Sequence, residues 1–240
     1  MNAAHLYKRF GDKVVLEDVS LTVPDGAVVS LMAPSGRGKT TLLRCIAGLE
    51  MLDSGTVTGV PERLGFVFQE DRLCPQLDAV ENVRLVTGRA MSRPDIEAHL
   101  LELGLADCLD QRAAELSGGQ RTKILLGKLL LEKPDILLLD EPTNYLDVQH
   151  IEWLKRYLLD YENAFVLISH DIPFLNSVVN LIYHMENQRL DRYVGDYNKF
   201  QEVYEVKKAQ LEAAYKRQQQ EISELKDFVA RNKARVSTRN

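Results

Sequence analysis

Short apolar runs and helical patterns alternate along most of the chain. Apolar runs predict strands at 14–16, 19–23, 27–32, 56–58, 64–68, 135–139 and 165–168, with two shorter strands near 181–184 and 189–194. Between them, apolar residues three and four positions apart predict helices. Strands that alternate with helices are typical of an α/β fold built on a largely parallel sheet. The pattern therefore predicts an α/β domain.

Residues 77 to 115 interrupt the strands with a long helical pattern, and we interpret them as a helical insertion. A second helix is predicted after 116–120, with Ser117 as its N-cap and a stop near Glu132, before Lys133-Pro134. A third helix follows Asp147. Its aromatic stripe (Trp153, Tyr157 and Tyr161) indicates packing, with a partner surface as the alternative.

The pattern changes from about Asn198. No Pro or Gly follows Gly195, and seven of the ten positions on a 4-3 spacing between 204 and 236 are apolar or aromatic. This predicts a long amphipathic helix with a face suited to a partner helix. We therefore divide the chain into a domain at 1–198 and a helical tail at 199–240.

Composition narrows the class of protein. The chain has 240 residues, of which 45% are hydrophobic and 27% charged, as in a globular protein with a sizeable core. No signal peptide or bilayer-length apolar run is recognised, so we expect a cytoplasmic protein whose membrane role, if it has one, depends on a partner. Cys45, Cys74 and Cys108 are too far apart for paired metal ligands or a CxxC motif.

Charge is distributed unevenly between the two parts. The net charge is −5, with +4 on residues 199–240 and −9 on the remainder. An acidic body argues against broad nonspecific binding to nucleic acid. The basic tail is either a solvated helical face or a contact with RNA or the ribosome.

The first candidate for chemistry is the segment Ala33-Pro34-Ser35-Gly36-Arg37-Gly38-Lys39-Thr40-Thr41, which lies between a predicted strand and a predicted helix. Small residues there let backbone N–H groups converge on anionic oxygens, and the helix N-terminus adds its positive dipole. In such a phosphate loop Lys39 reaches the β- and γ-phosphates and Thr40 binds Mg²⁺. The alternative is an ordinary strand-to-helix turn.

The phosphate-loop pattern has Gly at the position of Ala33. Alanine is tolerable there if its φ stays negative. If the loop instead needs a flexible residue at that position, nucleotide binding is weakened, and an unchanged affinity in Ala33→Gly would dismiss that idea.

Three further features suit a nucleotide site. Phe10, beside Gly11, either stacks on a purine or packs in the core. Asp140 and Glu141 close an apolar strand, and ligands of parallel sheets bind beyond the carboxyl ends of strands. Helix capping is the alternative role for this acid pair. His170 follows the next predicted core strand.

Four signals stand in a specific order along the chain. Gln69 follows Lys39 by thirty residues, Leu116-Ser117-Gly118-Gly119-Gln120 precedes the acid pair, and His170 follows Asp140 by thirty residues. Across residues 5 to 198 this order resembles the nucleotide-binding domain of ATP-binding cassette (ABC) proteins. The resemblance implies a P-loop NTPase fold with a mixed-sheet core, an antiparallel β subdomain, a helical subdomain at about 75–115 and, here, a long C-terminal helix.

The resemblance also implies ATP and Mg²⁺ as ligands. Phe10 would stack on adenine, and Asp140 would hold Mg²⁺ with Thr40 and Gln69. Glu141 would polarise the attacking water, and His170 would contact the γ-phosphate. Such chemistry requires charge neutralisation and an oriented water.

A second set of residues would act across a dimer. In the ABC family the signature residues Ser117, Gly118 and Gly119, followed by Gln120, cap the γ-phosphate bound to the other protomer, and Asp147 lies in a loop that touches it. The resemblance therefore implies a head-to-tail dimer, as a homodimer or with a second ABC domain, enclosing two ATP molecules.

The two halves resemble different ABC branches. Residues 5 to 115 are similar to ATPase subunits of importers for nitrate, sulfonate or taurine, whereas residues 116 to 240 are similar to ABC-F proteins, which act on ribosomes. A fusion or fragment is therefore a serious alternative. Three functions follow: a soluble ABC-F-type ATPase with a ribosomal partner, a transporter subunit at the inner face of the membrane with a separate permease, and a non-catalytic nucleotide-gated module or inactive chimera.

Overall fold

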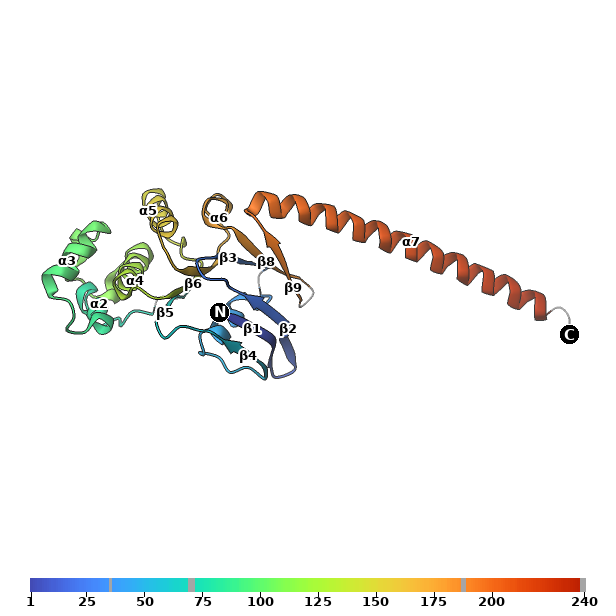
Figure 1. The fold of residues 1–240 in the computed structure, drawn as a ribbon, viewed down its shortest axis with the longest axis horizontal. Helices are drawn as coiled ribbons and strands as arrows, with labels where there is room; N and C mark the ends of the chain where they lie inside the picture. The colour runs from blue at the N-terminus through green and yellow to red at the C-terminus, as the bar shows by residue number, and fades with distance from the viewer. Residues whose placement is uncertain (35, 69–71, 187–188, 238–240) are drawn as a thin grey trace. The chain divides into compact units, whose positions relative to one another are not determined.

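The structure is a computed structural model that describes residues 1–34, 36–68, 72–186 and 189–237. The chain divides into two compact units, Met1–Tyr197 and Asn198–Asn240. The first unit holds two sheets and most of the helices, and the second is a helix (Figure 1).

The larger sheet is the α/β core that the apolar runs predict. Its strands are β3 (Val28–Met32), β5 (Leu64–Val67), β6 (Ile136–Asp140), β7 (Ala164–Ile168), β8 (Leu181–Glu186) and β9 (Arg189–Val194). They lie in the order β5-β6-β7-β3-β8-β9, and only the β8–β9 pair is antiparallel. Every residue of β6 and β7 is buried, because neighbours cover both faces of these central strands. The mixed sheet predicted for the core is confirmed.

The smaller sheet corrects part of the strand prediction. It is antiparallel and consists of β1 (Asn2–Phe10), β2 (Lys13–Thr22) and β4 (Ser54–Thr58), in the order β2-β1-β4. The two strands predicted at 14–16 and 19–23 are one strand, and β1 was not predicted. Asp18 has φ 54° and the β1–β2 register shifts near it, so the alternation breaks while pairing with β1 continues.

Helices cover the core and form a separate cluster. They are α1 (Lys39–Ile46), α2 (Ala79–Thr87), α3 (Arg93–Glu102), α4 (Gly118–Glu132), α5 (Val148–Leu159) and α6 (Ile172–Val178). Figure 1 shows α2, α3 and α4 together at one end of the first unit. Their shared core includes the fully buried Val83, Ile96, Leu100 and Ile124. Helices α2 and α3 lie within residues 77–115, where the helical insertion was predicted, with short 3₁₀ turns at Ala106–Cys108 and Ala113–Glu115.

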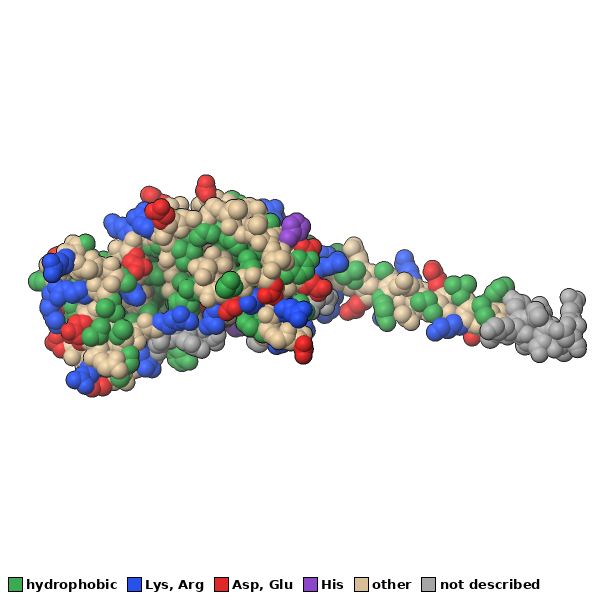
Figure 2. Space-filling view, turned by 90° about the horizontal axis from the view of Figure 1, so that it is seen from below, with side chains coloured by type: hydrophobic (Ala, Val, Ile, Leu, Met, Phe, Trp, Pro, Cys, Tyr) green, Lys and Arg blue, Asp and Glu red, His purple; other side chains and the backbone are tan. Residues whose placement is uncertain are grey.

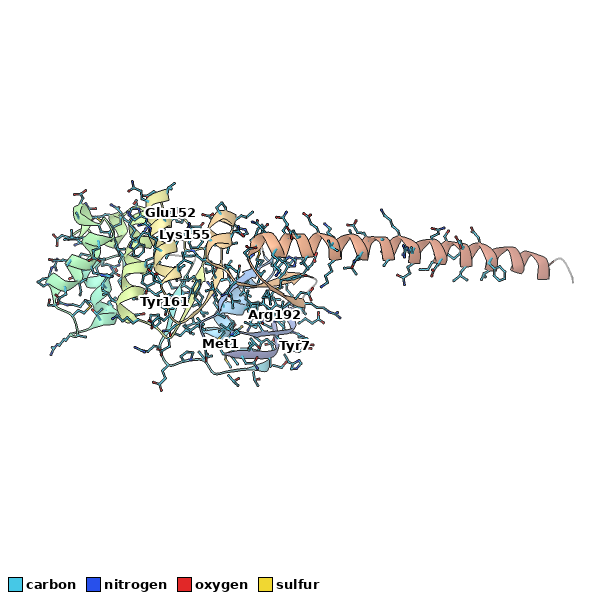
Figure 3. All side chains as sticks on the ribbon, turned by 45° about the horizontal axis from the view of Figure 1, so that its top comes forward. Met1, Tyr7, Glu152, Lys155, Tyr161 and Arg192 are labelled. Carbon is cyan, nitrogen blue, oxygen red and sulfur yellow. The ribbon has the colours of Figure 1, made fainter. Side chains whose placement is uncertain are left out.

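The aromatic stripe, of which Trp153 and Tyr157 lie on α5 and Tyr161 follows it, is half-buried within the first unit. Trp153 and Tyr157 stack with ring centroids 6.0 Å apart, and Tyr161 meets Phe165 of β7 edge-on at 6.4 Å. The Tyr161 hydroxyl donates to the Pro134 carbonyl. Figure 3 shows Tyr161 beyond the C-terminal end of α5.

The second unit is dominated by α7 (Tyr197–Ser237), a helix of 41 residues. Its described side chains from 205 to 229 are all exposed, and they include Leu211, Tyr215, Leu225 and Phe228. Apolar side chains are visible along it between charged ones in Figure 2. No described helix combines the length and apolar character that a bilayer span requires.

Candidate nucleotide-binding site

A cleft lies where three parallel strands end. Because β3, β6 and β7 are parallel neighbours, the residues that follow them meet at one edge of the sheet. The cleft has a volume of about 600 Å³. Its lining residues are Phe10, Lys13, Val15, Gly36, Gly38, Lys39, Thr40, Thr41, Asp140, Glu141, Asn144, Ile168 and His170.

Nine of the residues singled out in the sequence meet in this cleft. Those that line it are Phe10, Gly36, Gly38, Lys39, Thr40, Thr41, Asp140, Glu141 and His170. Ala33, Pro34 and Arg37 belong to the same loop without lining the cleft, and Ser35 and Gln69 lie outside the described residues. The signature residues Ser117, Gly118, Gly119 and Gln120 and the loop residue Asp147 lie elsewhere in the chain's own fold.

The loop before α1 is shaped to hold an anion. Gly36 and Gly38 have φ values of 75° and 94°, which side-chain-bearing residues rarely adopt. A Cβ on Gly38 would also lie 2.7 Å from Cγ1 of Val15. Gly38 is the N-cap of α1 and has no side chain with which to bond the first-turn N–H groups. Those donors, at the positive end of the helix dipole, are available to phosphate oxygens.

Ala33 fits this loop without strain. It is not among the described residues with positive φ, and it packs partly buried against the main core. We therefore expect Ala33→Gly to leave the Kd for ATP within about two-fold of the parent, because the native backbone does not require glycine there. Titration with a fluorescent ATP analogue measures this. A markedly tighter Kd in the variant would show that alanine weakens binding.

Lys39 is buried at the centre of the site. Its Nζ donates to the carbonyl oxygens of Ala33 at 2.6 Å and Pro34 at 3.4 Å. Burial lowers the pKa of Lys39, whereas the charges of Glu141 and Asp140 act to raise the same pKa. Among the described residues the ammonium group has two acids nearby and hydrogen bonds to two carbonyl oxygens, and it can exchange these carbonyl partners for phosphate oxygens.

Thr40 and Asp140 form a suitable pair for a hard cation. The Thr40 hydroxyl donates to Oδ2 of Asp140 at 2.7 Å, and Asp140 is only 2% exposed. Burial raises the pKa of Asp140, and the Thr40 hydrogen bond and the Lys39 charge oppose this shift. Within the described part of the chain, no three His, Cys, Asp or Glu residues group closely enough to hold a metal. Mg²⁺ in proteins takes one or two carboxylates together with waters and substrate phosphates, so Thr40 and Asp140 would supply part of its shell.

Glu141 and His170 face each other across the ends of β6 and β7. The His170 backbone N–H donates to Oε2 of Glu141 at 3.1 Å, and Nε2 of the ring lies 3.3 Å from Oε1. Glu141 is buried and has φ 52°, a strained conformation for a non-glycine residue. This places a fixed carboxylate and an imidazole beside the phosphate loop.

Phe10 presents an open ring to the cleft. It is 49% exposed, so the core-packing alternative does not describe it. The Nζ of Lys8 lies 4.8 Å from the ring centroid and is held by Glu50 at 2.6 Å and the Met51 carbonyl at 2.7 Å. Lys8 does not line the cleft, whereas Phe10 does, so the ring remains available for stacking.

We expect Phe10→Ala to weaken ATP binding while leaving the binding of inorganic triphosphate unchanged. Stacking of a base on an aromatic ring contributes about 1–3 kcal/mol, or about 5- to 150-fold in Kd. Competition of both ligands against a fluorescent nucleotide separates the base contact from the phosphate contact. An equal loss for ATP and triphosphate would show that Phe10 supports the loop rather than the base.

Lys13, Val15, Asn144 and Ile168 line the cleft although the sequence did not single them out. Asn144 comes three residues after Glu141, and Lys13 comes three residues after Phe10. For these two residues, the sequence signal that could have found them was their proximity to a predicted site residue. Val15 and Ile168 are ordinary strand residues by their pattern. Only the approach of β2 to the loop places Val15 at the site.

The signature residues begin helix α4. Ser117 is its N-cap as predicted: its Oγ accepts from the Gln120 backbone N–H at 3.3 Å, and Gln120 Oε1 accepts from the Ser117 N–H at 2.8 Å. Asp147 likewise caps α5, where its carboxylate accepts from the His150 backbone and lies 2.5 Å from Nδ1 of that ring. The hydrogen bond to the His150 ring lowers the pKa of Asp147.

Comparison with known proteins gives consistent matches. Two family models, both described as ABC transporter, match residues 16–144 and 183–240. The uncharacterized ABC transporter ATP-binding protein YfmM of Bacillus subtilis is 49% identical over 96% of this chain and 53% of YfmM. The energy-dependent translational throttle protein EttA of Haemophilus influenzae is 33% identical, covering 91% of this chain and 47% of EttA. The chain thus spans about half the length of these curated relatives.

Solved structures agree on the fold. An ATP-binding subunit of an ABC transporter superposes with a TM-score of 0.72 at 22% identity, covering 80% of this chain and 89% of that one. The ATP-binding cassette MJ0796, a dimer in a post-hydrolysis state bound to ADP and Pi, has a TM-score of 0.69 at 26% identity and covers 80% and 97%. The first family model alone matches more than half of the chain. The chain belongs to the ABC transporter family and carries its ATPase domain.

Proposed function

We propose that this chain binds ATP with Mg²⁺ and hydrolyses it. The observation that carries the proposal is the meeting of the Thr40–Asp140 pair and the Glu141–His170 pair beside the phosphate loop in one cleft. Thr40 and Asp140 would hold Mg²⁺, which neutralises charge on the phosphate oxygens. Glu141 would accept a proton from the attacking water, and His170 would hold the Glu141 carboxylate in place.

The proposed hydrolysis takes place in a head-to-tail dimer. The signature turn at the start of α4 offers N–H donors to an anion but does not line the chain's own cleft. A second protomer, or a second ABC domain, would supply this turn to each ATP. The structure of MJ0796, which is a dimer bound to ADP and Pi, supports a dimer as the working form.

ATPase rate measured against protein concentration tests both steps. We expect the rate per protomer to rise with concentration, because each complete site needs two chains. Phosphate release that is absent at every concentration would exclude hydrolysis. A rate per protomer that does not depend on concentration over a range in which the chain is monomeric would exclude the dimer.

We further propose a role in translation, with the ribosome as partner and the cytoplasm as location. EttA, whose name describes a translational throttle, matches this chain over 91% of its residues. YfmM matches 96% of the chain, so counterparts of both halves occur together in one protein. The exposed apolar and basic positions of α7 offer a surface for a macromolecular partner.

Co-sedimentation with purified ribosomes tests the partner. We expect ATP-dependent pelleting that is stronger in Glu141→Gln, because the variant would retain ATP between the protomers. Pelleting that is equal with and without ATP would contradict the coupling of ATP binding to ribosome binding.

The alternative, an ATP-binding subunit that energises a separate permease, has support in the ABC transporter description of the family models. It predicts recovery with membranes only when a permease is co-expressed.

A further inference from the structure

Tyr145 lies against the signature turn of its own chain. It belongs to the loop between β6 and α5, has φ 66°, and its side chain is 73% exposed. A Cβ added to Gly118 would lie 3.2 Å from Cγ and 3.4 Å from Cδ1 of the Tyr145 ring. A Cβ added to Gly119 would lie 2.6 Å from the Tyr145 carbonyl oxygen. Because Gly118 and Gly119 have no side chains, Tyr145 can occupy the space beside them.

The same loop is anchored to the catalytic end of the sheet. The Asn144 N–H donates to the Glu141 carbonyl at 3.1 Å, one residue before Tyr145. The Thr143 hydroxyl lies 3.4 Å from the Ser169 hydroxyl, in a buried contact with the end of β7. A short hydrogen-bonded turn thus connects Glu141 to Tyr145, and Tyr145 connects this turn to α4.

We propose that Tyr145 is a positioning residue that sets the signature turn relative to Glu141. The inference rests on the proposed ATPase function and deepens it, because α4 belongs to the helical cluster whereas Glu141 follows strand β6 of the main sheet. Tyr145 does not line the cleft, so it acts through Gly118 and Gly119. A left-handed backbone on an aromatic residue carries strain, and strain of this kind concentrates at functional sites.

Kinetics of two Tyr145 variants test the positioning role. We expect Tyr145→Ala to lower kcat about ten-fold, because small displacements of groups that contact the reacting phosphate reduce rates strongly, while KM for ATP stays within about two-fold. Tyr145→Phe should restore kcat, since the atoms nearest the glycines are ring carbons and the backbone. If Tyr145→Ala merely destabilised the fold, kcat would not fall while KM stayed unchanged. Nor would Tyr145→Phe then restore kcat.

Thermal unfolding of double variants tests the contact between Tyr145 and the signature glycines. This measurement does not require ATP hydrolysis. Gly118→Ala should lower Tm less in the Tyr145→Ala background than in the parent, because the ring atoms that it approaches are gone. Gly119→Ala is the matched control. It approaches a backbone oxygen that Tyr145→Ala retains, so its loss of Tm should be the same in both backgrounds.

The outcomes separate the inference from the function on which it rests. Additive Tm losses for Gly118→Ala and Tyr145→Ala would overturn the contact. Non-additive losses with an unchanged kcat in Tyr145→Ala would overturn the positioning role. Absence of hydrolysis in the parent chain would overturn the proposed function and the positioning role together, and the Tm cycle would then show a structural contact alone.

Discussion

Glu141→Gln is expected to lower kcat for ATP hydrolysis by about 10²- to 10⁴-fold, the range that a positioned general base contributes. Glutamine keeps the length of the side chain and an oxygen to accept from the His170 N–H, but it cannot accept a proton from water. ATP affinity should therefore be retained, and the variant should accumulate as an ATP-bound dimer. Phosphate release under single-turnover conditions and light scattering with ATP measure the two effects.

Glu152→Gln is the matched control for this charge change. Glu152 lies on α5 at the surface, where it pairs only loosely with Lys155 at 3.5 Å (Figure 3). Its substitution should leave kcat unchanged, because exposed pairs contribute little. A Glu141→Gln rate within a few-fold of the parent would show that another group, or water alone, accepts the proton.

Lys39→Ala is expected to weaken the binding of both ATP and inorganic triphosphate by about 10- to 150-fold. Hydrogen bonds to charged groups contribute about 1.5–3 kcal/mol, and the variant loses the ammonium donor that bonds to the Ala33 carbonyl of the phosphate loop. The substitution also leaves Asp140 and Glu141 without their buried cation, which adds repulsion toward a polyanion. Isothermal titration with each ligand gives the two Kd values.

Lys13→Ala provides the comparison for Lys39. Lys13 also lines the cleft, but its side chain is exposed, so water screens its charge. Its removal should weaken binding by only a few-fold. Equal losses in the two variants would indicate a general effect of positive charge in the cleft rather than a specific contact made by Lys39.

The main sheet and the phosphate loop were predictable because their signals are local. Strands β6 and β7 are continuous apolar runs, and burial on both faces of a central parallel strand requires such runs. Gly36 and Gly38 directly precede a helix whose N-terminus has no side-chain cap, so the signal for a phosphate loop lies in adjacent residues. The start of α4 at Ser117 follows from its own capping pattern in the same way.

The antiparallel sheet was not predictable to the same extent. Its strand β1 lacks a regular alternation, and pairing with β2 and β4 rather than local pattern stabilises it. Asp18 interrupts the alternation of β2, so a single strand resembled two. The position of the Lys8 ammonium group beside Phe10 likewise depends on Glu50 and Met51, which are about forty residues from Lys8 in the chain.

The sequence by itself determined which residues are candidates for the chemistry: a phosphate loop, an acid pair, a histidine and a signature turn, in an order that resembles ABC proteins. Only the tertiary structure decided which of these groups meet. The Thr40–Asp140 hydrogen bond joins residues 100 positions apart, and Tyr145 reaches Gly118 from another element. Local patterns specify helices and strands through propensity and burial, whereas such contacts arise only when sheet order and close packing bring distant segments together.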